Sequence, residues 1–283
     1  MNKMNVFGYC NNEYNIPSLN ESDQLKFKTN QVGTSKGVLL KWNFIKDGRN
    51  YFIKAGSSNG IILSPLEPIA EVISYKLGKL LGVNVVPTAI TEIDINEGYY
   101  GLKKQTALVS YTEDFKTSKF NKFIPAIQLI DIKNFNYNSL GPTLTRFKEE
   151  LNKMLMFDFI IGNYDRHLNN FGVLANSDMT EMIFAPIFDN GSSLLNQYNN
   201  DDLMNLNPKD VDKYSTAKPF NLTQTKQVNL INPLPKINLE INHSEITDIV
   251  NEFIYDLPEY RRKRIINFIE RRLMYARKIY SKG

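Results

Sequence analysis

The chain has few of the residues that build disulfides and zinc sites. Its 283 residues contain one cysteine, Cys10, and two histidines, His167 and His243. One cysteine cannot form an intrachain disulfide, and so few cysteines and histidines argue against a Cys/His zinc site. The composition therefore suits a reducing cytosol, and it leaves export open.

Long apolar runs are also missing. No run reaches the roughly 20 residues that a membrane-spanning helix needs. Residues 1–22 lack the apolar core of a secretory signal peptide. We therefore expect a soluble protein without a membrane span, and any export would proceed without a classical signal peptide.

Acidic residues are scarce near the C-terminus. The chain has a formal net charge of +4, but residues 259–282 alone hold nine basic and two acidic side chains. Apolar residues recur there at helical spacing, which predicts an amphipathic helix with its arginines on the solvated face. The alternative is a surface that binds nucleic acid or an acidic partner.

The first part of the chain is rich in β-forming residues. Residues 38–45 and 51–55 are typical of two strands around a tight turn at Asp47-Gly48. A glycine-bracketed loop precedes them, and its backbone amides could approach an anion; an ordinary entry into the hairpin is the alternative. The loop consists of Gly33, Thr34, Ser35, Lys36 and Gly37.

One helix follows this hairpin. Ser64, Pro65 and Glu67 fit the N-cap, first and third positions of a capping box. Apolar residues then recur at helical spacing up to Gly82, a residue typical of a helix end. The remaining strands of this part are predicted at residues 83–93 and 105–111.

The second part is predicted to be mostly helical. Residues 141–162 should form one long helix, and a short strand pair follows it. Two further helices are predicted at 244–257 and 259–280, beyond a long polar loop. The chain is therefore expected to be an α+β protein. We divide it into a first lobe with a small antiparallel sheet and one helix, 1–112, and a mostly helical second lobe, 113–283.

A dense group of polar residues lies directly behind the long apolar helix. In "GNYDRHLNN", Asp165 precedes Asn170 by five positions, which is the D-x-x-x-x-N spacing of a kinase catalytic loop. In such a loop the Asp accepts the proton of the attacking hydroxyl and the Asn binds a metal ion. Asn169 is the alternative to Asn170. We expect Arg166 and His167 to tie the loop to the core.

A second metal-binding carboxylate should follow on a short hairpin. Asp189 lies there, in "PIFDNGSSL". Phosphoryl transfer moves a highly charged group between two oxygens, so the protein must hold Mg²⁺ on the phosphates. One carboxylate and one amide oxygen are hard ligands of the kind that Mg²⁺ favours. Asp158, on the preceding helix, is expected to order the loop by hydrogen bonding.

Two charged residues of the first lobe complete the set of residues expected at a phosphoryl-transfer site. Lys54 ends the second strand, in "YFIK", and fits the pattern of a lysine that reaches the phosphates. Glu71 lies on the helix that follows and is expected to pair with Lys54. Glu67 is a weaker candidate because it serves the cap. The order of a Gly loop, Lys, Glu, Asp/Asn and Asp is more specific than any single element.

These motifs together resemble those of the HipA-like serine/threonine kinases. The family's catalytic stretch has the form G-N-x-D-x-H-x-x-N, and its later metal site reads Y-D-x-G-x-S-L; the chain has "GNYDRHLNN" and "FDNGSSL". Within the family, the sequence is most similar to the small cell-translocating kinases. It departs from the pattern at Phe188, where Tyr is common, and at Arg166. Lipid kinases of the phosphatidylinositol 3-/4-kinase type share the D-R-H-x-x-N core, which is ambiguous alone.

The resemblance implies a two-lobed protein-kinase-like fold that uses ATP and Mg²⁺. By position, Asp165 matches the catalytic Asp, and Asn170 and Asp189 match the metal ligands. Lys54 matches the phosphate-contacting lysine, and Glu71 matches its helix partner. The implied adenine-binding hinge residues are Ser110 and Tyr111, and the implied autophosphorylation candidates are Ser57, Ser58 and Ser64.

We therefore expect an ATP- and Mg²⁺-dependent serine/threonine protein kinase that autophosphorylates. The resemblance implies a bacterial enzyme of the cytoplasm, or a secreted effector that is translocated into a host cell and acts on proteins there. Two alternatives stay open. One is a lipid or small-molecule kinase, and the other is a non-catalytic nucleic-acid-binding module that uses the basic C-terminal helix.

Overall fold

The computed structural model describes residues 39–46, 48–95 and 101–281. The predicted glycine loop, residues 33–37, lies outside the described residues, as does Cys10. The phosphate-cradling role of that loop therefore stays a prediction.

The chain forms two compact units. Among the described residues, the first unit comprises those within 39–75 and 86–114, and the second comprises those within 76–85 and 115–281. Helix α1 (Leu66–Leu81) contributes to both units because the division falls inside it.

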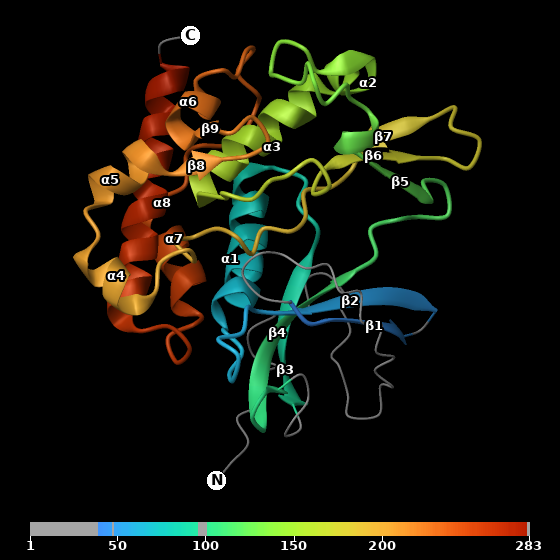
Figure 1. The fold of residues 1–283 in the computed structure, drawn as a ribbon. Coiled ribbons are helices and arrows are strands. Elements are labelled where there is room, and N and C mark those ends of the chain that lie inside the picture. Colours follow the sequence, from blue (N-terminus) through green and yellow to red (C-terminus); the bar gives the residue numbers. More distant parts are fainter. Residues whose placement is uncertain (1–38, 47, 96–100, 282–283) are drawn as a thin grey trace. The chain divides into compact units, whose positions relative to one another are not determined.

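The first unit holds a four-stranded antiparallel sheet with the strand order β1-β2-β4-β3 (Figure 1). The predicted hairpin forms, and Gly48 in its turn has a φ of 74°, which glycine adopts without steric cost. Tyr51, Ile53 and Ala55 alternate along β2 and are buried in the core of the unit. The strands are β1 (Lys41–Lys46), β2 (Arg49–Ala55), β3 (Thr88–Ile95) and β4 (Gln105–Glu113).

Helix α1 begins without the predicted capping box. The Ser64 hydroxyl accepts a hydrogen bond from the backbone N–H of Leu66 at 3.1 Å. The Ser64 N–H, however, donates to the carbonyl of Ser57 at 2.8 Å. One carboxylate oxygen of Glu67 is buried without a hydrogen-bond partner among the described residues. The capping-box prediction is wrong because closure of the preceding loop uses the Ser64 amide.

The second unit is mostly helical, as predicted. The region predicted as one helix, 141–162, forms two helices, α2 (Gly141–Arg146) and α3 (Lys148–Ile161). Phe147 separates them because its φ of −106° and ψ of 31° are not helical, and its ring packs 6.4 Å from that of Phe184. Ten of the 14 residues of α3 are buried, so this helix forms the centre of the unit.

A small sheet and further helices complete the second unit. The sheet has the strand order β5-β6-β7, and short helices occupy much of the region predicted as a polar loop. No helix within the described ranges is long and apolar enough to cross a bilayer. The elements are β5 (Lys122–Pro125), the 3-10 helix η3 (Ala126–Gln128), β6 (Gly172–Ala175), β7 (Met182–Phe184), α4 (Asn200–Asn205), α5 (Pro208–Tyr214), β8 (Thr216–Ala217), β9 (Leu222–Thr223), α6 (Gln224–Val228), α7 (His243–Asn251) and α8 (Glu259–Tyr280).

The arginines of α8 contradict the predicted solvated face. Arg261, Arg262 and Arg272 are buried. Arg261 donates to the carbonyl of Tyr198 at 2.7 Å, and the guanidinium carbon of Arg272 lies 4.4 Å from the ring centroid of Phe159. Arginine suits this environment because its planar guanidinium can bond carbonyls and stack on rings. Part of the basic charge of α8 therefore serves packing within the unit.

Candidate active site

The predicted catalytic loop begins where helix α3 ends. Gly162 ends the helix with a left-handed φ of 70°, a conformation typical of glycine at this position. The backbone N–H of Asn163 donates to the carbonyl of Asp158 at 2.9 Å. The side-chain oxygen of Asn163 accepts a hydrogen bond from the backbone N–H of Asp165, also at 2.9 Å. These contacts fix the direction of the loop and the backbone of Asp165.

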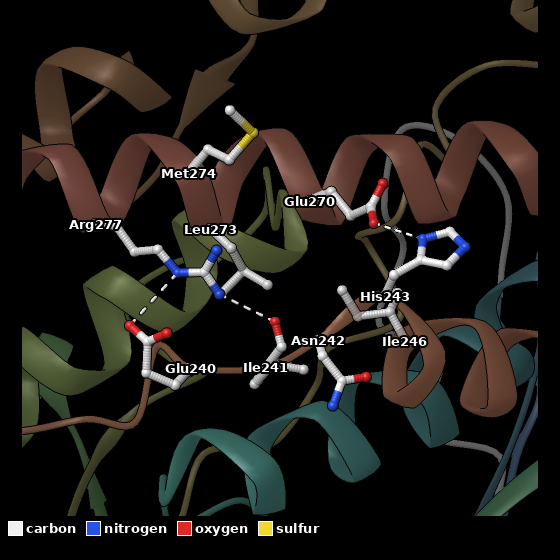
Figure 2. Close-up of a pocket in the computed structure, with 9 residues that line it drawn as sticks. All are labelled: Glu240, Ile241, Asn242, His243, Ile246, Glu270, Leu273, Met274 and Arg277. Atoms are coloured by element: carbon white, nitrogen blue, oxygen red, sulfur yellow. Dashed lines mark hydrogen bonds and ion pairs between the residues drawn. The ribbon is translucent and has the colours of Figure 1, made fainter.

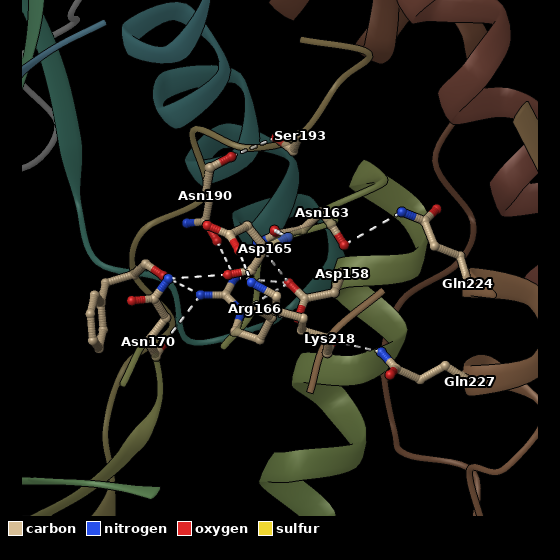
Figure 3. A network of polar contacts seen from close by, with 11 residues as sticks. Asp158, Asn163, Asp165, Arg166, Asn170, Asn190, Ser193, Lys218, Gln224 and Gln227 are labelled. Atoms are coloured by element: carbon tan, nitrogen blue, oxygen red, sulfur yellow. Dashed lines mark hydrogen bonds and ion pairs between the residues drawn. The ribbon is translucent and has the colours of Figure 1, made fainter. Parts of the chain in front are cut away.

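Arg166 is the centre of a buried polar network (Figure 3). Its guanidinium pairs with Asp158 at 2.8 Å and donates to the side-chain oxygen of Asn190 at 2.6 Å. It also donates to the backbone carbonyl of Asn170, at 3.3 Å, and to that of Phe188. The prediction that Arg166 ties the loop to the core is confirmed. One side chain thereby joins the predicted catalytic loop to the loop of the second predicted metal ligand.

Asp158 supplies the buried counter-charge of this network. Complete burial raises the pKa of its carboxyl, while the Arg166 guanidinium and the Asn163 amide oppose this rise. The Asn163 amide donates to the carboxylate at 3.3 Å. A buried charge is tolerated when it is paired and hydrogen-bonded in this way. The expectation that Asp158 orders the loop is confirmed.

Asp165 and Asn170 are linked within the loop. The Asn170 side-chain nitrogen donates to the Asp165 carbonyl at 3.2 Å, which places the amide oxygen, the atom that a metal would take, on the other side of the group. Asn170 is buried whereas Asn169 is exposed, and this difference favours Asn170 as the ligand. His167 makes a contact inside the loop: its backbone N–H donates to the Asp165 carbonyl at 2.7 Å.

No sequence pattern singles out Lys218, yet its ammonium contacts the predicted catalytic aspartate. The Lys218 nitrogen lies 2.6 Å from Oδ1 of Asp165. Lys218 follows strand β8 directly, in the turn between β8 and β9. The contact joins segments that are distant along the chain, so spacing within a motif could not have revealed it.

Asp189 has a left-handed backbone conformation between two neighbours that contact other residues. Its φ of 60° is left-handed, which is uncommon for residues other than glycine. The ring of Phe188, on one side, packs 5.2 Å from that of Phe115. The carbonyl of Asn190, on the other side, accepts a hydrogen bond from the Ser193 hydroxyl at 2.6 Å. Backbone conformations of this kind cluster at functional sites.

The donors on these two loops suit Mg²⁺. Asp189 offers a carboxylate and Asn170 an amide oxygen, which are hard ligands that Mg²⁺ binds alongside water and phosphate oxygens. Arg166 donates to the carbonyls of Asn170 and Phe188, at or beside the two predicted ligands, and so fixes the two loops relative to each other. Within the part of the chain that the structure describes, no group of three or more His, Cys, Asp or Glu side chains could hold a metal.

The first unit contains the predicted Lys–Glu pair. The Lys54 ammonium lies 3.6 Å from Oε1 of Glu71, and the two side chains are 23% and 8% exposed. Lys54 on β2 is paired with Ser110 on β4, whose hydroxyl donates to the Lys54 carbonyl at 3.5 Å. Ser110 and Tyr111, the implied hinge residues, are both buried. The ion pair is confirmed, whereas its phosphate contact and the hinge role stay predictions.

The implied autophosphorylation candidates lie in a hydrogen-bonded loop before α1. The Ser58 hydroxyl accepts from the backbone N–H of Gly60 at 2.9 Å. Ser64 bonds Leu66 through its hydroxyl, and the Ser57 carbonyl accepts from the Ser64 N–H at 2.8 Å. All three serines therefore belong to one small loop, and their modification stays a prediction.

A separate hollow of about 440 Å³ lies beside α8 (Figure 2). Beside it, Nδ1 of His243 lies 2.6 Å from the Glu270 carboxylate, and Nε of Arg277 lies 3.8 Å from the Glu240 carboxylate. Arg277 also donates to the carbonyl of Ile241 at 3.0 Å. These contacts fasten the start of α7 and the segment before it to α8. None of the predicted catalytic or metal-binding residues lines this hollow, so it is not part of the candidate active site.

The fold is similar to that of a solved kinase. The crystal structure of the Helicobacter pylori proinflammatory kinase CtkA matches with a TM-score of 0.59 and 16% sequence identity, over 89% of this chain and 92% of that chain. At this identity the match establishes the fold alone. The predicted α+β, protein-kinase-like fold is confirmed.

A match to a family model identifies the class of protein more specifically than the fold does. Residues 28–259 match the model of the HipA-like C-terminal domain. The match covers most of the chain, so the chain belongs to the HipA-like C-terminal domain family. The resemblance that the two motifs indicated is thereby confirmed.

One curated relative matches at the level of sequence. It is the serine/threonine-protein kinase CtkA of Helicobacter pylori (strain J99 / ATCC 700824), which is 31% identical over 141 residues. The match covers 40% of this chain and 43% of the relative. The chain thus spans less than half the length of the curated relative that it matches.

Proposed function

We propose that the chain is an ATP- and Mg²⁺-dependent serine/threonine protein kinase of the HipA-like type. The observation that carries the proposal is the bridge through Arg166, which joins the loop of Asp165 and Asn170 to the loop that contains Asp189. Phosphoryl transfer needs such a grouping, because the acceptor must be aimed while the phosphoryl charge is neutralised. Family membership and the similarity to CtkA support the same activity.

The second unit would supply the chemistry of transfer. Asp165, whose side chain is 33% exposed, would accept the proton of a serine or threonine hydroxyl as that oxygen attacks the γ-phosphorus. Asn170 and Asp189 would hold Mg²⁺, which neutralises charge on the phosphate oxygens when it is bound. Arg166 would keep these groups in register without contacting the substrate.

The first unit would bind the nucleotide. Lys54, held by Glu71, would contact the phosphates of ATP. Backbone groups of Ser110 and Tyr111 would receive the adenine, in line with the family resemblance. The glycine loop at residues 33–37 would cover the phosphates.

The acceptor is proposed from the resemblance. Serine or threonine hydroxyls of proteins are the proposed targets, including those of host-cell proteins if the chain is exported. Autophosphorylation would use the loop before α1, where the candidates are Ser57, Ser58 and Ser64.

Two substitutions test the proposal. Asp165→Asn and Asp189→Asn should each reduce transfer of ³²P from labelled ATP by at least ~10²-fold, the usual scale for loss of a general base or a charge-stabilising group. Both variants should keep the wild-type melting temperature. Asp248→Asn, on the exposed side of α7, is the matched control and should keep full activity. If Asp165→Asn or Asp189→Asn keeps wild-type activity, the role proposed for that residue is wrong.

A panel of acceptors tests the substrate class. A lipid kinase is a genuine alternative because its D-R-H-x-x-N core is also present in this chain. Proteins, phosphoinositides and aminoglycosides should be offered with labelled ATP, and we expect transfer to protein. Transfer to a non-protein acceptor alone would overturn the protein-kinase proposal and leave the phosphotransferase proposal in place.

The nucleic-acid alternative is less well supported by the structure. Arg261, Arg262 and Arg272 are buried, so they cannot form a basic surface on α8. Salt-sensitive nucleic-acid binding, without a thermal shift on addition of Mg·ATP, would favour this alternative over the kinase.

A further inference from the structure

Lys218 is a cation that the kinase motifs do not account for. Its ammonium lies 2.6 Å from Oδ1 of Asp165, and the two side chains are 44% and 33% exposed. It lies beyond both loops of the candidate active site, in the turn between β8 and β9. The pair is therefore open to solvent, and a substrate could reach it.

Hydrogen bonds within the second unit hold the backbone of Lys218 in place (Figure 3). The side-chain nitrogen of the buried Gln227 donates to the Lys218 carbonyl at 3.0 Å. Gln224, also buried, donates to the Asn163 carbonyl at 3.4 Å. Asn163 in turn holds the backbone N–H of Asp165. Two buried glutamines of α6 thus fix the turn that carries Lys218 and the loop that carries Asp165.

Stability does not explain this arrangement. An ion pair between partly exposed side chains contributes little to the free energy of folding, because water screens it and ordering a lysine costs entropy. Buried polar groups are usually hydrogen-bonded, and the side-chain nitrogens of the two buried glutamines donate to the backbones of the two loops. The arrangement places a positive charge beside the proposed base rather than strengthening the core.

A positive charge in this position favours phosphoryl transfer. Negative charge spreads over the oxygens of the transferred group, and lysine or arginine side chains commonly stabilise it there. A lysine ammonium has three N–H donors and no acceptor. One donor on Asp165 leaves others for a phosphoryl oxygen, and both partners are anionic.

We propose that Lys218 is a phosphoryl-binding catalytic residue of the second unit. Its ammonium holds Oδ1 of Asp165, which leaves Oδ2 for the acceptor hydroxyl, and it donates to an oxygen of the transferred phosphoryl group. This inference rests on the proposed kinase function and extends it by one residue.

The transfer step balances without further reactants. A bond forms between the acceptor oxygen and the γ-phosphorus, while the bond from that phosphorus to the β–γ bridging oxygen breaks. The hydroxyl proton passes to Asp165, and ADP leaves with the bridging electron pair. Lys218 keeps its proton and forms only hydrogen bonds.

A nucleotide titration tests the role of Lys218 separately from the proposed kinase function. Wild type, Lys218→Met and the control Lys226→Met, an exposed lysine on α6, should be titrated with Mg·AMP-PNP and with Mg·ADP by calorimetry. Loss of a charge-assisted hydrogen bond to the γ-phosphate should weaken AMP-PNP binding by the order of tenfold in Lys218→Met. Its affinity for ADP should not change, and Lys226→Met should match wild type with both nucleotides.

The outcomes of this titration are distinct. Equal weakening of both nucleotides, or of neither, in Lys218→Met would overturn the contact with the γ-phosphate while leaving the kinase proposal intact. A wild-type protein that binds neither nucleotide would overturn the proposed function, and the inference would fall with it.

Kinetics test the contribution to the chemical step. Lys218→Met should lower kcat for protein phosphorylation by ~10²–10³-fold, the usual cost of removing one transition-state donor, and should raise KM for ATP by about the factor that weakens AMP-PNP binding, with little change in melting temperature. In a Cys10→Ser background, Lys218→Cys treated with 2-bromoethylamine regains an ammonium at nearly the same place. We expect this treatment to restore most of kcat. Higher activity in Lys218→Met would show instead that the lysine blocks Asp165, and unchanged kcat would show that it has no catalytic role.

Discussion

At the scale of single residues, the site depends on Arg166, which lies next to the proposed base and is fully buried. The partners of its guanidinium include the Asp158 carboxylate and the carbonyls of Asn170 and Phe188. A lysine has the same charge but not the planar, forked set of donors that reaches several partners at once. The identity of this residue therefore determines how the two loops are joined.

Replacement of Arg166 should destabilise the second unit. Arg166→Met leaves the Asp158 carboxylate buried without its counter-charge, so we expect a loss of about 3–5 kcal/mol in the free energy of unfolding. Arg166→Lys keeps the charge and should lose less. Urea unfolding of the three proteins measures the difference. A Met variant as stable as wild type would show that the network does not hold the loops.

Single residues differed in how well the sequence predicted them. Asp165 and Asn170 follow a spacing along the chain, and the roles of Arg166 and Asp158 follow from their place beside that loop. Lys218 could not be predicted, because its contact with Asp165 depends on how a distant turn folds back. Burial in the folded chain, which composition does not reveal, favours Asn170 over the exposed Asn169 as the predicted metal ligand.

At the scale of elements, the end of α3 determines where the proposed catalytic loop starts. Gly162 has a φ of 70°, and a Cβ added there would lie 2.5 Å from the ring of Phe268 on α8. Gly82 ends α1 with the same φ, but a Cβ there would meet nothing within 4 Å. The two glycines share the conformational requirement and differ only in the packing around them.

Alanine substitutions of Gly82 and Gly162 test whether packing against α8 constrains the end of α3. Gly82→Ala should cost about 1–2 kcal/mol, the penalty of a left-handed conformation for a residue with a Cβ. Gly162→Ala should cost that penalty plus roughly 1–3 kcal/mol for overpacking against Phe268. Thermal and urea unfolding measure both. Equal losses in the two variants would mean that the contact with α8 does not constrain the end of α3.

The arginines of α8 give a second element-scale prediction. Arg261 donates to the Tyr198 carbonyl at 2.7 Å and to the Asn200 side chain at 3.0 Å. Arg261→Met should therefore cost about 1–3 kcal/mol, because two hydrogen bonds from a charged group would be lost. Lys263→Met, on the exposed side of α8, should change the urea midpoint little. If Lys263→Met is as destabilising as Arg261→Met, burial of the arginine is not the cause.

The sequence predicted the bounds of an element correctly where one rule, such as apolar periodicity, was enough to define it. Periodicity gave α8 over residues 259–280, but it placed the arginines on the wrong face because it counts every charged residue as exposed. The break at Phe147 was missed because neither proline nor glycine marks it. The capping box at Ser64 failed because a loop carbonyl bonds the same amide.

At the scale of the whole molecule, the chain forms two compact units, and each holds some of the residues that the kinase motifs predict. The Lys54–Glu71 pair lies in the first unit, and the loops of Asp165 and Asp189 lie in the second. The chain order of these parts predicted a kinase-like fold, and the fold match and the family model support it. The activity remains a proposal because the sequence match spans 43% of the curated relative.

The most direct test of that proposal is mass spectrometry of the chain after incubation with Mg·ATP. Wild type should gain the mass of phosphate on serine or threonine, with the loop at Ser57, Ser58 and Ser64 as the expected site, and Asp165→Asn should gain none. Omission of Mg²⁺ should also abolish the modification. Absence of phosphate from wild type and from every protein acceptor offered, or equal phosphorylation of Asp165→Asn, would contradict the assignment of the chain as a protein kinase with Asp165 as its base.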